Sequence, residues 1–232
     1  MTTASTTTPP AEAPKAPSPW LAHARVFVAH IEKICVADTG ARAALRSGLG
    51  KRLDEVPRMH RIVAPLLPQA AQDEHTQRAF YTVAALIAAQ KSEALRASRF
   101  ASSTEAEAGR EGDQAAVGIS PYGVSLGSTF AAAVALGHGG LRESAAETRL
   151  NLLTRQSPAG LHRHLPSSVR QLCDKRTPPD WAQLLVHLRA WPTHRRSIGR
   201  RWLQDFYRAR HKAVLDAALE ADDATLPEDS QL

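Results

Sequence analysis

Apolar residues recur at intervals of three and four along most of the chain, and this spacing predicts α-helices. The first helix is expected over residues 19–37, where Ser18 can cap the N-terminus and Pro19 can take the first helical position. Asp73 is expected to cap a later, central helix. Its apolar stripe consists of Phe80, Val83, Ala84 and Ile87.

The same spacing predicts helices in the rest of the chain, and no segment alternates with the period of two that marks a half-buried β-strand. Pro166 is expected to bend its helix or to shift the start of that helix, and Pro192 is expected to end another. The further helices are 41–49, 57–64, 125–136, one from an S-x-x-E capping box at Ser144 and Glu147 to Arg155, 158–173, one from Pro178 to Pro192, and 195–219. The predicted fold class is all-α.

Composition divides the chain into two helical halves joined by a flexible loop, with disordered N- and C-terminal tails. The first residues are Thr, Ala and Pro with almost no large apolar side chains, so they cannot offset the entropy lost on ordering. After Phe100 the chain turns rich in Ser, Glu, Gly and Ala, which indicates a loop. The predicted segments are a tail (1–18), an N-terminal bundle (19–101), a linker (102–122), a C-terminal bundle (123–219) and an acidic tail (220–232).

The formal net charge of +6 hides a partition along the chain. Residues 216–232 carry six acidic and no Lys or Arg side chains, so that residues 1–215 hold 29 basic against 17 acidic groups, or +12. Without the segment 102–118 the remainder reaches +15. An excess of this size suits a polyanionic partner, although an Arg-rich composition alone also produces a solvated basic face.

The basic residues are distributed through predicted helices rather than gathered in one terminal run. Residues 142–212 contain 15 Lys or Arg against five Asp or Glu. Most of the 12 aromatic residues fit apolar stripes, so few remain to stack on bases, and we expect contacts to a nucleic-acid backbone that depend little on sequence and steeply on salt. The candidate nucleic-acid-binding residues are Arg42, Arg46, Lys51, Arg52, Arg149, Arg155, Arg163 and Arg170.

The string Gly123-Val124-Ser125-Leu126-Gly127 matches the G-x-S-x-G elbow of serine hydrolases, which needs a strand before the serine. The residues before it hold Gly118 and Pro121 and do not resemble such a strand. We therefore expect Ser125 to cap the next helix and Gly127 to let another backbone approach closely, with no catalytic residue here.

Other chemistry is not indicated. Gly48 to Arg52 lacks the pattern of a phosphate loop, and the histidines and cysteines lack the spacing of a zinc site, so no cofactor and no metal are expected. Cys35 and Cys173 lie far apart in apolar helical patterns, which favours buried thiols and a cytoplasmic protein. No apolar stretch reaches the length of a membrane span.

Several short blocks stand out in order over residues 20–210. They are ARAALR (41–46) followed by Val56-Pro57, FYTVAAL (80–86), GVSLG (123–127), ETRL through Leu153 (147–153), LHRHL (161–165), Asp180-Trp181 through Trp191, and Trp202 to Tyr207. Together these blocks resemble the CasB small-subunit family of the type I-E CRISPR surveillance complex Cascade.

The resemblance implies a non-catalytic protein of two helical bundles that assembles with a second copy of itself along the complex. It also implies contacts with the large subunit, with the guide-bearing backbone subunits, and with crRNA-paired target DNA. The basic surface of such a subunit helps hold the displaced single-stranded non-target DNA and so stabilises the R-loop, whose formation is nearly balanced in base-pairing energy.

Among the candidates, Arg46, Arg149 and Arg163 match basic positions of the family's blocks. Ser47 stands where the family has a second basic residue and His164 where it often has Arg, so that Arg42, Lys51 and Arg52 are possible substitutes. Arg155 and Arg170 are placed only by their proximity to the blocks. Two other classes stay open: a free-standing helical DNA-binding regulator, and a hydrolase that uses Ser125.

Overall fold

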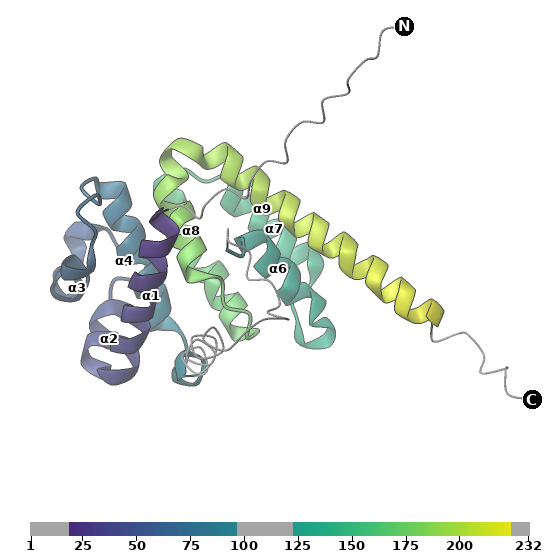
Figure 1. The fold of residues 1–232 in the computed structure, drawn as a ribbon, viewed down its shortest axis with the longest axis horizontal. Helices are drawn as coiled ribbons and strands as arrows, with labels where there is room; N and C mark the ends of the chain where they lie inside the picture. Colours follow the sequence, from purple (N-terminus) through teal and green to yellow (C-terminus); the bar gives the residue numbers. More distant parts are fainter. Residues whose placement is uncertain (1–18, 97–122, 224–232) are drawn as a thin grey trace, which may run out of the picture.

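The computed structural model describes residues 19–96 and 123–223, with side chains described as far as residue 219. This part of the chain is helical and contains no β-strand, as the sequence predicts (Figure 1). The α-helices are α1 (Pro19–Ala37), α2 (Thr39–Arg46), α3 (Pro57–Val63), α4 (Glu74–Ala89), α6 (Leu126–Ala135), α7 (Glu143–Thr154), α8 (Pro158–Asp174) and α9 (Trp181–Asp223), with 3₁₀ turns at Leu53–Glu55, Ala64–Leu66 and Gly137–Gly139.

Helix α4 is central, as predicted, because every residue from Ala79 to Ala88 is buried. Asp73 caps it by accepting a hydrogen bond from the Thr76 amide at 2.8 Å. Its alanines leave room for neighbouring helices, while the Phe80 ring meets Phe27 of α1 edge-on, with the ring centroids 4.8 Å apart.

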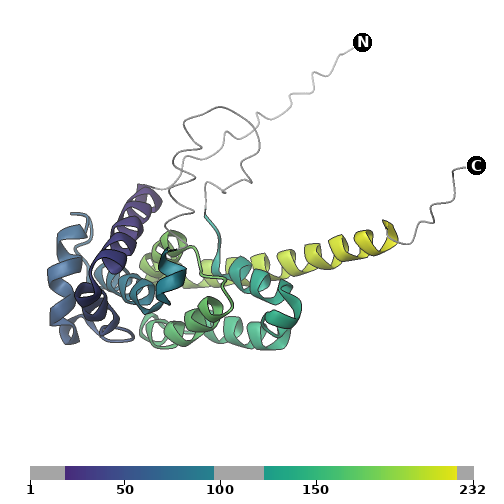
Figure 2. The same cartoon turned by 90° about the horizontal axis from the view of Figure 1, so that it is seen from below.

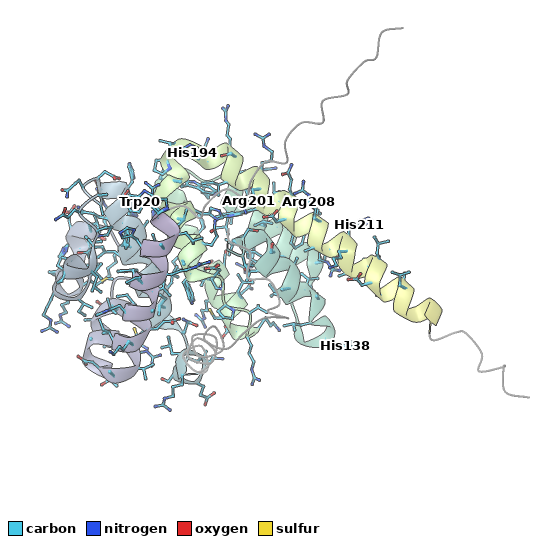
Figure 3. All side chains as sticks on the ribbon, in the orientation of Figure 1. Trp20, His138, His194, Arg201, Arg208 and His211 are labelled. Carbon is cyan, nitrogen blue, oxygen red and sulfur yellow. The ribbon has the colours of Figure 1, made fainter. Side chains whose placement is uncertain are left out.

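Helix α9 runs alongside both halves of the molecule, and its end projects beyond the other helices (Figures 1 and 2). It packs on α1 and α4. Near its start the Arg189 guanidinium lies 4.0 Å from the centroid of the ring of Trp20, which is labelled in Figure 3. Its later turns pack on α6 and α7. The buried residues of both halves consequently form one continuous core.

Several predicted boundaries shift. The predicted capping box at Ser144 is wrong, because α7 begins at Glu143, after Arg142. The Leu141 amide donates a 2.9 Å bond to the Ala133 carbonyl of α6, and this bond fixes the direction of the chain before Ser144 is reached. Helix α8 starts at Pro158 as predicted, after Ser157 as its N-cap, and continues through Pro166 to Asp174.

Pro192 does not end a helix. The interruption falls two residues later, at His194, whose φ of −118° and ψ of 19° are not helical. The predicted linker at 102–122 lies outside the described residues, which resume at Gly123, as do the tail 1–18 and most of the acidic tail, into which α9 continues as far as Asp223.

The two cysteines are free, as expected. Burial raises the pKa of each thiol to about 11. Thiolate, the reactive form, is therefore scarce at neutral pH.

Gly127 allows α6 to touch the backbone of α9. A Cβ atom at this position would stand 1.8 Å from the Trp202 carbonyl oxygen and 2.7 Å from its carbon. The expectation of a close backbone approach is confirmed, and Ser125 is the N-cap, accepting a 3.2 Å bond from the Ser128 amide.

Gly127→Ala is expected to lower the free energy of unfolding by about 1–3 kcal/mol or more, because two backbones must separate to admit the methyl group. Gly139→Ala is the matched control, since nothing lies within 4 Å of a Cβ there. Urea denaturation followed by circular dichroism measures both; equal effects of the two variants would contradict the close-approach explanation.

Two buried histidines are held neutral. Nδ1 of His187 accepts a 3.0 Å bond from the Trp202 indole, and its Nε2 lies 2.7 Å from the side-chain nitrogen of Gln183. Nδ1 of His162 lies 2.9 Å from the Thr82 hydroxyl. Burial lowers the pKa of each histidine to about 3.

The unfolded chain therefore binds more protons than the folded chain between pH 6.5 and pH 3, and stability falls as the pH drops through this window. From pH 7 to pH 4.5 the loss is expected to be on the order of 2 kcal/mol per histidine. Urea denaturation at the two pH values measures it. His162→Asn, which removes the titrating ring, should lose less stability over the same interval, and an equal loss would refute the assignment to His162.

Candidate nucleic-acid interface

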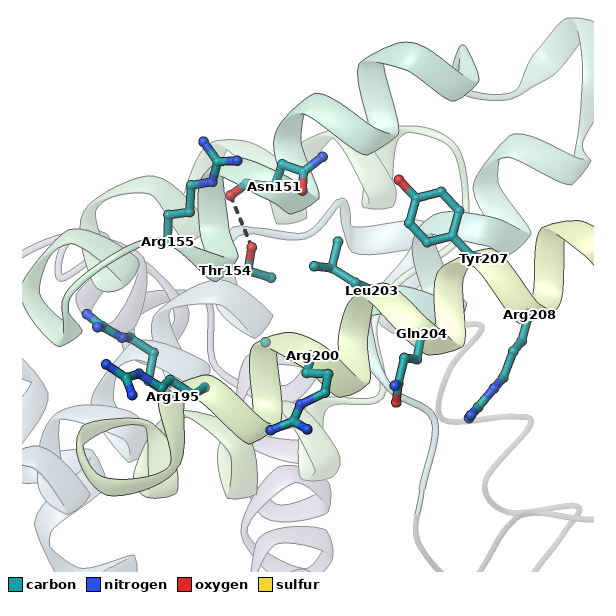
Figure 4. A pocket seen from close by; sticks show the side chains of 11 residues that line it. Asn151, Thr154, Arg155, Arg195, Arg200, Leu203, Gln204, Tyr207 and Arg208 are labelled. Atoms are coloured by element: carbon teal, nitrogen blue, oxygen red, sulfur yellow. Dashed lines mark hydrogen bonds between the residues drawn. The ribbon is translucent and has the colours of Figure 1, made fainter.

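A groove of about 790 Å³ lies between α7 and the middle of α9 (Figure 4). None of the residues that line it is acidic. Its five arginines are Arg155 at the end of α7 and Arg195, Arg196, Arg200 and Arg208 on α9. The side chains of all five are exposed, so their guanidinium groups are accessible to an anion in solution.

The spacing along α9 produces this arrangement. Arg196, Arg200 and Arg208 follow each other at multiples of four and so lie along one side of the helix. In the close view, Arg200 and Arg208 point away from α7, whereas Leu203 and Tyr207 lie on the side that faces it (Figure 4). The groove therefore has an apolar floor beside a basic rim.

Two features hold α7 and α9 together. Gly199 stands where a Cβ would be 3.2 Å from Thr154 Cβ, so the helices are close at one end of the groove. Toward the other end Arg210 makes two bonds to the Glu143 carboxylate, at 3.2 and 3.0 Å, which hold the pKa of Glu143 below its usual value. Arg210 is thereby paired and does not add to the basic rim.

Asp205 partly offsets the charge of this stretch of α9. Its carboxylate lies 3.6 Å from Arg201 and 4.0 Å from Arg208, at the outer limit of an ion pair. Exposed pairs of this kind are weak, so Arg208 stays available to another anion. Figure 3 labels three residues along this part of α9: Arg201, Arg208 and His211.

Of the eight residues predicted from the sequence, the structure brings Arg155 into the groove. Arg149 also lies on α7, but two positions from Asn151, which corresponds to about 200° around the helix. The buried face of α7, at Ala146, Leu150 and Leu153, separates Arg149 from the groove.

Four exposed residues lie elsewhere: Arg46, Lys51 and Arg52 on or after α2, and Arg163 on α8. Arg170 of α8 borders a second cavity, of about 400 Å³, together with Leu49 and Lys91. Asp174 compensates charge there, since it lies 3.2 Å from Lys91 and 3.9 Å from Arg170.

Arg42 has a different position. Its guanidinium donates to the Ala88 carbonyl at 3.1 Å, to the Gln90 carbonyl, and to the Ser92 hydroxyl at 2.5 Å. These bonds satisfy carbonyls at the C-terminal end of α4, so we leave Arg42 out of the interface proposed below.

Arg42→Ala should lower the free energy of unfolding by about 1.5–3 kcal/mol, because the variant cannot make the charge-assisted bonds to part-buried carbonyls. Arg46→Ala, one turn further along α2 and exposed, should change it by less than about 0.5 kcal/mol. Thermal and urea denaturation measure the pair; a stable Arg42→Ala protein would show that α4 does not need this cap.

Four arginines of the groove are absent from the residues predicted from the sequence: Arg195, Arg196, Arg200 and Arg208. Their charge contributes to the basic excess of the segment 142–212. Their spacing on the predicted 195–219 helix is a signal in the sequence that could have identified them. No sequence signal indicated that Arg155 would face them.

The described residues hold no group of three or more His, Cys, Asp or Glu that could bind a metal ion. Within the same ranges, no helix is long and apolar enough to cross a membrane. Ser125 is buried, and its hydroxyl is engaged in the first turn of α6, where it lies 3.2 Å from the Ser128 hydroxyl as well as from the Ser128 amide.

Comparison with known proteins gives a consistent result. A chain of a solved CRISPR RNA-guided surveillance complex is 34% identical, with a TM-score of 0.67 over 85% of this chain and 99% of that chain. A pre-nicking form of such a complex matches at 35% identity with the same TM-score, covering 85% and 98% of the two chains. CasB from Thermus thermophilus shares the fold at 22% identity, with a TM-score of 0.55 over 79% and 97%.

No curated protein sequence matches significantly. The model of the family CRISPR-associated protein Cse2 matches residues 41–207, which span α2 to the middle of α9 and include every arginine of the groove except Arg208. On these grounds the chain belongs to the CRISPR-associated Cse2 family.

Proposed function

We propose that this chain is a non-catalytic small subunit of a Cascade-type complex that holds the displaced non-target DNA strand by its phosphates and so stabilises the R-loop. The observation that carries the proposal is the groove between α7 and α9, with five exposed arginines and no acid in its lining. Guanidinium groups bind phosphate oxygens through paired N–H donors, which suits a polyanionic chain.

Contact through phosphates accounts for binding of the displaced strand that is independent of base sequence. Phosphate contacts position a nucleic acid but carry no sequence information. R-loop formation exchanges one duplex for another of similar stability, so that modest contacts to the displaced strand shift the balance. Holding a strand in this way requires no reaction of the chain.

The remaining exposed candidates, Arg46, Lys51, Arg52, Arg163 and Arg170, together with Arg149, lie outside the groove. We propose that they extend the basic surface toward α2 and α8, where crRNA-paired target DNA or other Cascade subunits approach. The second copy of the chain and the large and backbone subunits are the expected protein partners.

Reversing three groove charges tests the proposal. The combination Arg155→Glu, Arg200→Glu and Arg208→Glu should weaken binding of a single-stranded oligonucleotide and make its salt dependence shallower by roughly 0.7 for each phosphate that the variant no longer neutralises. Fluorescence anisotropy at several salt concentrations measures the slope, and footprinting of the displaced strand measures R-loop retention in the assembled complex.

The matched control reverses Arg25, Arg58 and Arg61, which are exposed on α1 and α3 and lie outside the groove. It changes net charge by the same amount and should leave the salt slope and the R-loop near the wild-type values. Equal losses of binding in the two triple variants would show that net charge, and not the groove, accounts for the binding. A preference of the wild-type chain for one duplex sequence would favour a free-standing regulator instead.

A further inference from the structure

One aromatic residue of the groove belongs to no buried stripe. Tyr207 lines the groove between α7 and α9 and is 48% exposed, whereas its neighbour Phe206 is fully buried. Arginines alone attract phosphates, so an exposed aromatic ring among them offers a nucleic acid a contact of a different kind.

The Tyr207 ring packs against its neighbour on α9, and the Glu147 carboxylate of α7 lies near its hydroxyl. Partial burial together with that carboxylate raises the pKa of the hydroxyl. Phe206 meets the ring edge-on, with centroids 5.2 Å apart and the planes at 77°. A ring restrained in this way loses little conformational entropy when another flat group packs on it.

The surroundings suit a nucleotide. Leu203 and Tyr207 form an apolar strip on the α7 side of α9, and Arg200 and Arg208 lie along the same helix on the outer side (Figure 4). A strand along α9 can place its phosphates on the arginines while an unpaired base turns toward the strip. A base inside a duplex cannot, because its faces are already stacked.

We propose that Tyr207 is a base-stacking residue that makes the α7–α9 groove select single-stranded over double-stranded nucleic acid. This inference rests on the proposed function and deepens it, because the arginines supply attraction to any polyanion and Tyr207 supplies the discrimination. Stacking is tolerant of sequence, since every base presents a π-face. Binding is then independent of base sequence but still selects single strands over duplexes.

The test compares three probes of equal length on the full chain: oligo-dT, the same backbone with abasic sites throughout, and a DNA duplex. Tyr207→Leu removes the aromatic face and keeps apolar bulk. Tyr207→Phe is the matched control, because it keeps the ring and removes only the hydroxyl. Anisotropy titrations give the affinities, and the salt slope reports the phosphate contacts separately.

The wild-type chain should bind oligo-dT more tightly than the abasic strand and the duplex. Tyr207→Leu should lose about 5- to 100-fold in affinity for oligo-dT while its affinity for the abasic strand and its salt slope stay unchanged. Tyr207→Phe should keep most of the oligo-dT affinity, and circular dichroism should show both variants folded.

Two results would overturn the stacking role while leaving the proposed function intact: equal wild-type binding of oligo-dT and the abasic strand, or equal losses on both probes in Tyr207→Leu. If the wild-type chain bound none of the three probes at low salt, the proposed function would fail, and the stacking role with it.

Discussion

The contact between the backbones of α6 and α9 at Gly127 and Trp202 is the constraint on which the rest of the molecule depends. A side chain at position 127 would occupy the space of the Trp202 carbonyl, so this turn of α9 can lie in only one place against α6. The Trp202 indole bonds to His187, and its ring lies 5.0 Å from that of Trp191. These contacts join the two parts of α9 across the non-helical residue His194.

Once α9 is seated, its outer surface is positioned with it. Before His194, Arg189 lies against Trp20 of α1, and after it Gly199 and Trp202 lie against α7 and α6. Because a helix is rigid over a few turns, the arginines from Arg195 to Arg208 keep a fixed relation to α7. The Arg210–Glu143 pair and the small Gly199 hold the two helices at the distance that leaves a groove between them. The groove is therefore a consequence of core packing and needs no mobile loop in its lining.

The partners of polar side chains also depend on how the helices pack. His162 and His187 lie in the core as neutral rings, each with a hydrogen-bond partner, and their burial is the reason that folding is expected to weaken in acid. Arg42, which the basic block at 41–46 suggested as a ligand of nucleic acid, instead satisfies carbonyls at the end of α4. An arginine on a helix surface can serve either purpose, and only its neighbours decide which.

The helices follow from local signals, because apolar spacing, the Asp73 and Ser125 caps and the flanking prolines act over a few residues. The sequence also indicated the family and the basic excess. Local signals placed the N-cap of α7 at Ser144, two residues after Arg142, and ended a helix at Pro192, since neither the bond from Leu141 to Ala133 nor the packing on both sides of His194 is visible in a short window. Which arginines meet, and that Tyr207 lies among them, depends on how distant helices pack. Facing side chains on α7 and α9 are some fifty residues apart along the chain, and their distance is set by the packing of both helices on a common core.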